Sequence, residues 1–143
     1  MPEETFVTGS AEETIALGRS LAARLKPPAL VLLIGDLGAG KTTLAKGLVS
    51  GLGAAPVEDV ASPTFTLIHE YGRDPKVYHI DFYRLDNIPE LETLGLDDLW
   101  DQNAIVLIEW GEKFDRRLPA ERVEIHLEQE GEERRRVRVI WEA

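Results

Sequence analysis

The chain has 143 residues, a net charge of −10 and no cysteine, which excludes disulfides, thiolate metal sites and a cysteine nucleophile. The length suits one domain spanning residues 1–143, and the negative charge opposes direct binding to nucleic acid. No apolar run approaches the roughly 18 residues of a membrane helix, and the opening MPEETFVTGS lacks the pattern of a secretory signal. We therefore expect a cytoplasmic protein.

The first half of the chain alternates between helical and strand patterns. Ser10–Lys26 predicts a helix, because Ser10 and Glu13 have the spacing of a capping box and two prolines end the pattern. Ala29–Ile34, with the sequence ALVLLI, is typical of a strand buried on both faces of a parallel sheet. A second helix is expected over residues 41–52, where a glycine ends it.

The middle of the chain predicts a hairpin and then a helix. Thr66–Tyr71 and Lys76–Phe82 are rich in β-branched and aromatic residues, and the turn-like GRDP lies between them. An antiparallel pair of strands is therefore expected. Asn87–Trp100 should be one helix, with Asn87 as its cap and a proline in its first turn.

The last part of the chain supplies another buried strand and a second hairpin. Ala104–Ile108, with the sequence AIVLI, again suits a buried parallel strand. Arg122–Glu128 and Arg134–Trp141 alternate in character around a glycine, which indicates a terminal hairpin. Together the elements predict a three-layer α/β domain with a central, mostly parallel sheet plus antiparallel hairpins.

Residues 35–43, GDLGAGKTT, have the spacing G-x-x-x-x-G-K-[ST] between an apolar strand and a helix. Glycines let backbone N–H groups point inward, and the helix N-terminus adds partial positive charge, so this P-loop predicts a phosphate site. Lys41 can reach the β- and γ-phosphates, and the Thr42 hydroxyl can bind Mg²⁺. The alternative is a glycine-rich turn with a solvated lysine. The candidate nucleotide-binding residues are Gly35, Asp36, Leu37, Gly38, Ala39, Gly40, Lys41, Thr42 and Thr43.

The expected fold is therefore a P-loop NTPase domain, and the expected nucleotide is ATP. Specific recognition of guanine would need an N-K-x-D motif downstream of the loop. Neither asparagine of the chain lies in such a motif, since they occur in LDNIPE and DQNAIV. ATP with Mg²⁺ is favoured over GTP on this absence.

Two carboxylates end predicted strands, where P-loop chemistry needs acids beside the metal. Asp81 ends KVYHID and Glu109 ends AIVLIE. A carboxylate at the carboxyl end of such a strand lies beside the phosphate loop, and it can bind the metal or orient an attacking water. The alternatives are an ion pair between Asp81 and Arg84, and an exposed strand end at Glu109.

Thr64 and Trp110 are further candidates for a catalytic role. Thr64 lies in SPTF, between the P-loop helix and the hairpin, where nucleotide switches place a threonine hydroxyl near the metal and the γ-phosphate. The alternative is a simple proline turn. Trp110 directly follows Glu109, and a tryptophan at a strand end is more often part of the core.

The histidines and a basic stretch carry weaker signals. His69 and His79 are expected to face each other or the core within the hairpin, and His126 to lie on a solvated face. None of the spacings suggests zinc. The basic stretch Arg134–Arg138 could contact RNA. It is more often a strand face paired with acids, here Glu124, Glu128 and the GEE turn.

Four motifs in this order resemble those of a known family. They are GDLGAGKTT, SPTFTLIHEY, HIDFYRL and LIEWGEK, and the likeness extends from the first predicted helix to about residue 114. This combination is similar to the TsaE (YjeE) family, the bacterial tRNA threonylcarbamoyladenosine biosynthesis ATPase. The terminal hairpin matches in character alone.

The resemblance implies an ATPase that works with two partner proteins, TsaB and TsaD, whose complex attaches a threonylcarbamoyl group to adenosine 37 of tRNA. ATP hydrolysis would reset that complex, and tRNA would be met only through it. Carried over by motif, Lys41 and Thr42 hold phosphate and Mg²⁺, and Thr64 is the switch-like hydroxyl. Trp110 would be required for activity. Asp81 and Glu109 would serve metal and water.

Two other functions fit a P-loop domain. A small-molecule kinase usually adds a lid with arginines over the transferred phosphoryl group, and Arg116-Arg117 is the pair here that could serve. A binding module would load ATP without hydrolysing it, and the paired acids argue against that reading. Phosphoryl transfer in a substrate screen would favour the kinase, and a turnover assay would separate the binding module.

Overall fold

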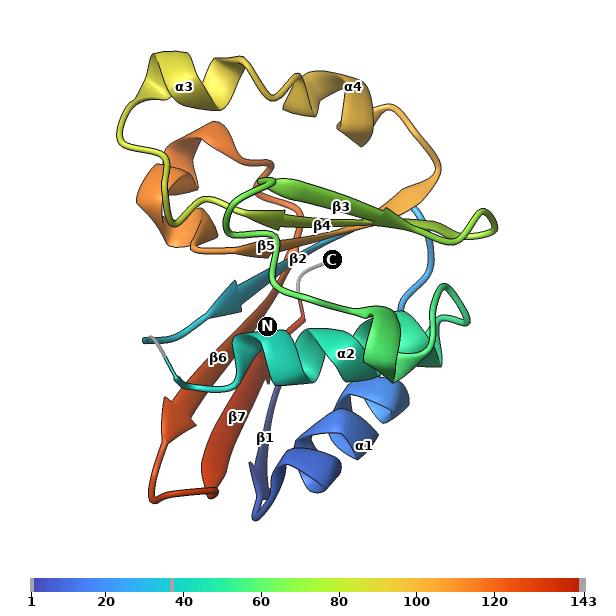
Figure 1. The fold of residues 1–143 in the computed structure, drawn as a ribbon, viewed down its shortest axis with the longest axis vertical. Coiled ribbons are helices and arrows are strands. Elements are labelled where there is room, and N and C mark those ends of the chain that lie inside the picture. Colours follow the sequence, from blue (N-terminus) through green and yellow to red (C-terminus); the bar gives the residue numbers. More distant parts are fainter. Residues whose placement is uncertain (1, 37, 142–143) are drawn as a thin grey trace.

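The computed structural model describes residues 2–36 and 38–141. They form a twisted seven-stranded sheet in the order β1-β7-β6-β2-β5-β4-β3, with helices on both faces (Figure 1). The strands are β1 (Glu3–Thr8), β2 (Ala29–Ile34), β3 (Ile68–Tyr71), β4 (Lys76–Asp81), β5 (Ala104–Glu109), β6 (Val123–Gln129) and β7 (Arg135–Ile140). The helices are α1 (Ala11–Ala22), α2 (Lys41–Gly51), α3 (Ile88–Glu92) and α4 (Leu96–Trp100), with 3₁₀ helices at Val57–Asp59 and Gly111–Arg117.

The sheet is parallel in its centre and antiparallel at both edges. β2 pairs in parallel with β5 and β6, and β4 pairs in parallel with β5. The hairpins β3–β4 and β6–β7 and the pair β1–β7 are antiparallel. The expected architecture, a mostly parallel core with antiparallel hairpins, is therefore confirmed.

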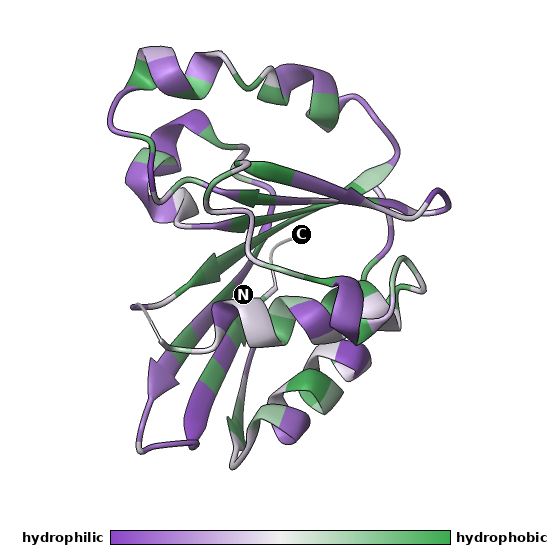
Figure 2. Ribbon diagram, in the orientation of Figure 1, coloured by the Kyte–Doolittle hydropathy of each residue, from purple (hydrophilic) through white to green (hydrophobic). Residues whose placement is uncertain are grey.

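Three layers follow from the alternation of side chains along the central strands. Val31 and Leu33 pack with α1 and α2 on one face, and Leu30 and Leu32 pack with α3, α4 and Leu118 on the other. Figure 2 shows the hydrophobic residues gathered in these central strands. Because both faces of β2 and β5 are covered, their sequences are continuous apolar runs.

Two predicted helices differ from the observed ones. α1 begins after the Ser10 cap as expected, with the Glu13 N–H donating to Ser10 Oγ at 3.1 Å, but it ends at Ala22 rather than Lys26. Beyond Ala22 the chain tightens into turns, in which the N–H groups of Arg24 and Leu25 donate to the carbonyl oxygens of Leu21 and Ala22. The helical conformation is disfavoured at Lys26, which precedes a proline. The helix predicted over residues 87–100 is two helices, α3 and α4, because Gly95 adopts a left-handed φ of +66° between them.

The first strand was not predicted. β1 is half-exposed along most of its length and pairs with β7 alone, so EETFVT carries little apolar signal of its own. Among the described residues, no helix is both long and apolar enough to cross a membrane.

Helices α1 and α2 approach each other closely at two glycines. A Cβ atom added to Gly47 would lie 2.2 Å from the carbonyl oxygen of Ile15 and 2.9 Å from the Cα of Gly18. Side chains at these positions would therefore force the helices apart. The close contact holds α2, whose N-terminus follows the P-loop, firmly against α1.

Candidate nucleotide site

The candidate residues meet at the carboxyl edge of the parallel strands. The P-loop connects β2 to α2, and Asp81 and Glu109 end β4 and β5 directly opposite each other in the register. A cavity of about 280 Å³ opens there. It is lined by Gly38, Gly40, Lys41, Thr42, Thr43, Ser62, Thr64, Asp81, Tyr83, Glu109, Trp110 and Arg135.

Three other described residues of the loop lie outside the cavity lining. Gly35, Asp36 and Ala39 belong to the same loop but do not line the cavity, and Leu37 is outside the described residues. Gly35 is required for packing, because a Cβ there would lie 2.7 Å from the carbonyl oxygen of Leu127 in β6. The loop is thereby pressed against the edge of β6.

Lys41 is buried in the cavity, with 5% of its surface exposed. Its Nζ donates to the carbonyl oxygen of Gly35 at 2.6 Å and lies 3.5 Å from the centre of the Trp110 ring. Burial lowers the pKa of Lys41, and the nearby carboxylates, Glu109 first among them, oppose this shift in part. The solvated lysine of the alternative reading is therefore not what the structure shows.

Glu109 is also buried rather than at an exposed strand end, with 3% of its surface exposed. Thr42 Oγ1 donates to its two carboxylate oxygens at 3.2 and 3.4 Å. On the other side, His79 Nε2 lies 2.6 Å from Oε2. The carboxylate is thus held between the first turn of α2 and the neighbouring strand β4.

Asp81 connects the hairpin to the SPTF segment. Its Oδ2 accepts a hydrogen bond from Thr64 Oγ1 at 2.9 Å, and its Oδ1 accepts from the Tyr83 N–H at 2.8 Å. The ion pair with Arg84, considered from the sequence, is not among the described salt bridges, since the Arg84 guanidinium lies 5.1 Å from the centre of the Phe65 ring.

The SPTF segment is a turn that also borders the cavity. Pro63 is buried, and its carbonyl oxygen accepts from the Leu67 N–H at 2.6 Å. Thr64 is half-buried and faces the cavity. The two readings of this segment are therefore compatible, because the turn is what presents the Thr64 hydroxyl to Asp81.

Trp110 has two environments at once. Its backbone is left-handed, with a φ of +63°, which turns the chain sharply after β5. The residue packs against the core cluster that includes Leu91 and Leu96, and it lines the cavity beside Tyr83, with ring centres 5.2 Å apart. The expectation that this tryptophan belongs to the core is therefore only partly correct, because Trp110 also lines the cavity.

The donors in the cavity suit Mg²⁺ better than a softer metal. Thr42, Asp81 and Glu109 offer hydroxyl and carboxylate oxygens, and Mg²⁺ is commonly held by one or two carboxylates together with substrate phosphates and water. No cluster of three or more His, Cys, Asp or Glu side chains that could hold a metal occurs among the described residues. The donor set therefore fits a metal carried in with a nucleotide.

Two residues of the site make contacts that the sequence did not predict. His79 was expected to face His69 or the core. It is opposite His69 in the register and fully buried, but its ring contacts Glu109. Arg135 lies against the P-loop and donates from Nη2 to the carbonyl oxygen of Gly38 at 3.2 Å. Both contacts join residues that are far apart in the sequence, so no local pattern indicates them.

The other arginines of the basic stretch have different partners from those expected. Arg134 and Arg136 pair with Glu130, and Arg138 pairs with Glu3 of β1. Glu124 instead contacts Arg122 and His126. His126 is half-buried through this contact, so the solvated face predicted for it is only partly correct.

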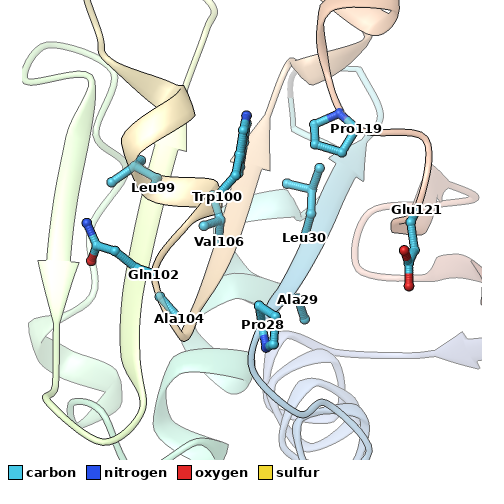
Figure 3. Close-up of a pocket in the computed structure, with 10 residues that line it drawn as sticks. All are labelled: Pro28, Ala29, Leu30, Leu99, Trp100, Gln102, Ala104, Val106, Pro119 and Glu121. Carbon is cyan, nitrogen blue, oxygen red and sulfur yellow. The ribbon is translucent and has the colours of Figure 1, made fainter.

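A second cavity, of about 220 Å³, lies at the amino ends of β2 and β5 (Figure 3). Pro28, Leu30, Trp100 and Val106 are among its mostly apolar lining. Since Gly35 and Glu109 follow the carboxyl ends of the same strands, this cavity is at the opposite edge of the sheet from the P-loop. We do not include it in the candidate site.

Known proteins are similar to this chain in both sequence and fold. The family model described as threonylcarbamoyl adenosine biosynthesis protein TsaE matches residues 8–137. The tRNA threonylcarbamoyladenosine biosynthesis protein TsaE of Bacillus subtilis is 41% identical over 138 residues, which cover 96% of this chain and 85% of that protein. The protein of the same name from Haemophilus influenzae is 48% identical over 91 residues, 63% of this chain and 56% of that protein.

The solved structure of YdiB from Bacillus subtilis superposes with a TM-score of 0.81 and 33% sequence identity. The match covers 99% of this chain and 87% of that one. The family model spans most of the strands, including the P-loop and both strand-end acids. The chain therefore belongs to the TsaE family of tRNA threonylcarbamoyladenosine biosynthesis proteins.

Proposed function

We propose that this chain is a single-domain cytoplasmic ATPase that binds and hydrolyses Mg-ATP to reset a complex of TsaB and TsaD proteins between rounds of tRNA modification. The observation that carries the proposal is the convergence of Lys41, Thr42, Thr64, Asp81 and Glu109 on one cavity beside the P-loop. Membership of the TsaE family supports the link to tRNA threonylcarbamoyladenosine.

The triphosphate would be held by the P-loop and by Lys41. The loop ends at the N-terminus of α2, whose free N–H groups and partial positive charge favour an anion. Lys41 Nζ already faces the cavity, and it would exchange the Gly35 carbonyl and the Trp110 ring for phosphate oxygens. The burial that lowers its pKa also strengthens its attraction to phosphate, because little water screens the pair.

Hydrolysis would depend on the two acids and two hydroxyls. Mg²⁺, when bound with the nucleotide, would supply positive charge that offsets the charge of the phosphates. The Thr42 hydroxyl and the Glu109 carboxylate are within hydrogen-bond distance and would hold this ion. Asp81 would orient the attacking water or share in holding the ion, while Thr64, now bonded to Asp81, would turn toward the γ-phosphate.

A smaller hollow beside the phosphate cavity, distinct from the cavity in Figure 3, offers room for the nucleoside. It has a volume of about 180 Å³ and shares Gly40, Thr43 and Arg135 with the phosphate cavity. The phosphates and the nucleoside would therefore lie in adjoining spaces on either side of the start of α2. Thr14 of α1 and Glu132 of the β6–β7 turn contribute to the second space.

The tRNA would be met through the partner proteins. The net charge is −10, and the arginines of the basic stretch pair with Glu130 and Glu3 or contact the P-loop. Docking of the partners would order the Thr64 segment over the γ-phosphate, so that hydrolysis follows complex formation.

The kinase alternative receives less support from the site. Arg116 and Arg117, the candidate lid arginines, lie in the 3₁₀ helix after Trp110 and do not line the phosphate cavity. A water-excluding lid over a second substrate would need cationic side chains there. In the described lining, Lys41 and Arg135 are the cations, and both contact the P-loop.

The deciding experiment measures ATP hydrolysis by the chain alone, with TsaB and TsaD proteins, and with tRNA added. Slow turnover alone and a marked rise with the partner complex are expected. Vigorous turnover that ignores the partners, or phosphoryl transfer to a small molecule, would contradict the proposal.

A further inference from the structure

His79 is a fully buried histidine whose ring contacts a candidate catalytic carboxylate. In the β4–β5 register His79 is opposite Leu107, and Asp81 is opposite Glu109. Since side chains alternate between faces along a strand, His79 and Glu109 project from the same face as diagonal neighbours. The distance from His79 Nε2 to Glu109 Oε2 is 2.6 Å, which is a short hydrogen bond.

Placing a histidine at this buried position lowers the stability of the fold. His79 is 0% exposed in the middle of a buried sheet, and among the described residues its Nδ1 atom has no hydrogen-bond partner. A buried polar atom without a partner destabilises a fold, and buried polar pairs are often less stabilising than apolar side chains of the same size. Packing alone therefore does not account for the imidazole.

The bond to Glu109 gives the ring a role. A carboxylate accepts hydrogen bonds, so Nε2 is the nitrogen that carries a hydrogen toward Glu109. In the described structure the side chains bonded to the Glu109 carboxylate are Thr42 and His79. If the Thr42 hydroxyl turns to a metal ion, His79 is left as the partner that fixes the carboxylate.

We propose that His79 is a positioning residue for ATP hydrolysis, holding the Glu109 carboxylate at the angle that its part in the reaction requires. This inference rests on the proposed ATPase function. His79 does not line the phosphate cavity, so it acts through Glu109 and not on the nucleotide. The role needs an N–H donor at the place of Nε2, which a neutral amide also supplies.

A matched pair of variants tests the donor position. In His79→Gln the amide nitrogen can reach the place of Nε2, whereas in His79→Asn it reaches only the place of Nδ1. With the partner proteins and tRNA present, His79→Gln is expected to keep kcat within a few-fold of wild type, and His79→Asn to lose roughly 10–100-fold, as for other residues that orient a metal-site ligand. The Kd for a fluorescent ATP analogue should change little in both.

Two controls separate positioning from structure. Tyr78→Phe removes a hydrogen bond from the adjacent residue of β4, where Tyr78 Oη donates to Gln102 Oε1 at 2.6 Å, and it should leave kcat unchanged. In a Glu109→Ala background, His79→Asn should cause no further loss of kcat, because the group that it orients is gone. Additive losses, or equal kcat for the Asn and Gln variants, would overturn the inference.

A measurement on the unaltered histidine stands apart from activity. Long-range ¹H–¹⁵N NMR of the ¹⁵N-histidine-labelled chain, assigned by elimination with His69→Gln and His126→Gln, should show hydrogen on Nε2 of His79, with a chemical shift that moves strongly in Glu109→Ala. The inference would be overturned if Nε2 carried no hydrogen, or if its chemical shift did not change in Glu109→Ala. This test holds even if no His79 variant folds. Absence of ATP turnover by the wild-type chain with its partners would instead defeat the proposed function.

Discussion

The ammonium nitrogen of Lys41 lies 3.5 Å from the centre of the Trp110 ring, so the P-loop and the segment after β5 are in direct contact. A cation over an aromatic face is attracted to it, more strongly where water is excluded. A phosphate that enters the cavity must compete with this ring and with the Gly35 carbonyl for the same lysine. Phosphate binding is therefore expected to be coupled to the position of Trp110.

Lys41→Ala should abolish tight nucleotide binding while the fold survives. The variant removes a charge-assisted contact to the β- and γ-phosphates, which contributes up to ~3 kcal/mol, or roughly 100-fold in affinity. Titration with a fluorescent ATP analogue measures the loss. Lys46→Ala, on the same helix α2, is the matched control and should bind normally. Unchanged affinity of Lys41→Ala would overturn the P-loop assignment.

As pH rises, the affinity for ATP should begin to fall at a lower pH than it would if Lys41 had the pKa of an ordinary lysine. Burial lowers the pKa of Lys41 in the free protein, and bound phosphates would raise it again by favouring the charged form. Between these two pKa values the complex holds a proton that the free protein lacks, so ATP binding takes up protons there and weakens as pH rises.

Calorimetry in two buffers of different ionisation enthalpy measures this uptake. Above about pH 8 the phosphates, with a pKa of ~6, no longer titrate. Proton uptake that grows with pH through the alkaline range is expected, and proton release in that range would contradict the lowered pKa of Lys41.

Glu109→Ala should separate binding from turnover. In the proposed function the carboxylate would act mainly in the transition state, so ATP should still bind while hydrolysis falls by ~10²-fold or more. Single-turnover ATPase assays with the partner proteins measure the loss. Glu121 is exposed at the opposite edge of the sheet, and Glu121→Ala should leave turnover unchanged. Near-normal turnover in Glu109→Ala would transfer the catalytic role to Asp81.

Gly47→Ala should destabilise the fold. The new methyl group would lie 2.2 Å from the Ile15 carbonyl oxygen, so α1 and α2 must separate. Overpacking of this kind costs about 1–3 kcal/mol, although alanine favours a helix more than glycine does. Urea unfolding followed by circular dichroism measures the change in the free energy of unfolding. A gain in stability would show that the helices adjust freely.

The isolated chain should bind tRNA weakly, if at all, at physiological salt. The net charge is −10, and Arg134, Arg136 and Arg138 are engaged with Glu130 and Glu3. A gel-shift assay over a range of salt concentrations tests this expectation. Tight, salt-sensitive binding would instead identify the basic stretch as an RNA site.

Local pattern was enough to predict much of the fold. Ala29–Ile34 was predicted with the bounds that β2 has, because a continuous apolar run bounded by prolines and glycines leaves little choice. β1 was missed because its half-exposed residues become a strand only by pairing with β7. The helix predicted over residues 87–100 includes Gly95, whose left-handed backbone divides the observed helix in two.

The site was predictable where topology alone decides. Asp81 and Glu109 were placed together because parallel strands end at one edge of a sheet. The contact of His79 with Glu109 depends on strand register, and that of Arg135 with the P-loop depends on the parallel pairing of β6 with β2. Neither contact is indicated by a local pattern in the sequence.

The pairing of β1 with β7 has a consequence for the order in which the sheet can form. β1 joins the sheet through β7, which is distant from it in the sequence, so β1 has no place in the sheet until β7 is in position. The parallel pairs β2–β5 and β4–β5 lie within residues 29–109 and need neither of these strands. The β1–β7 pair is therefore expected to form late, because pairing of strands so far apart in the sequence carries a large loop-closure entropy.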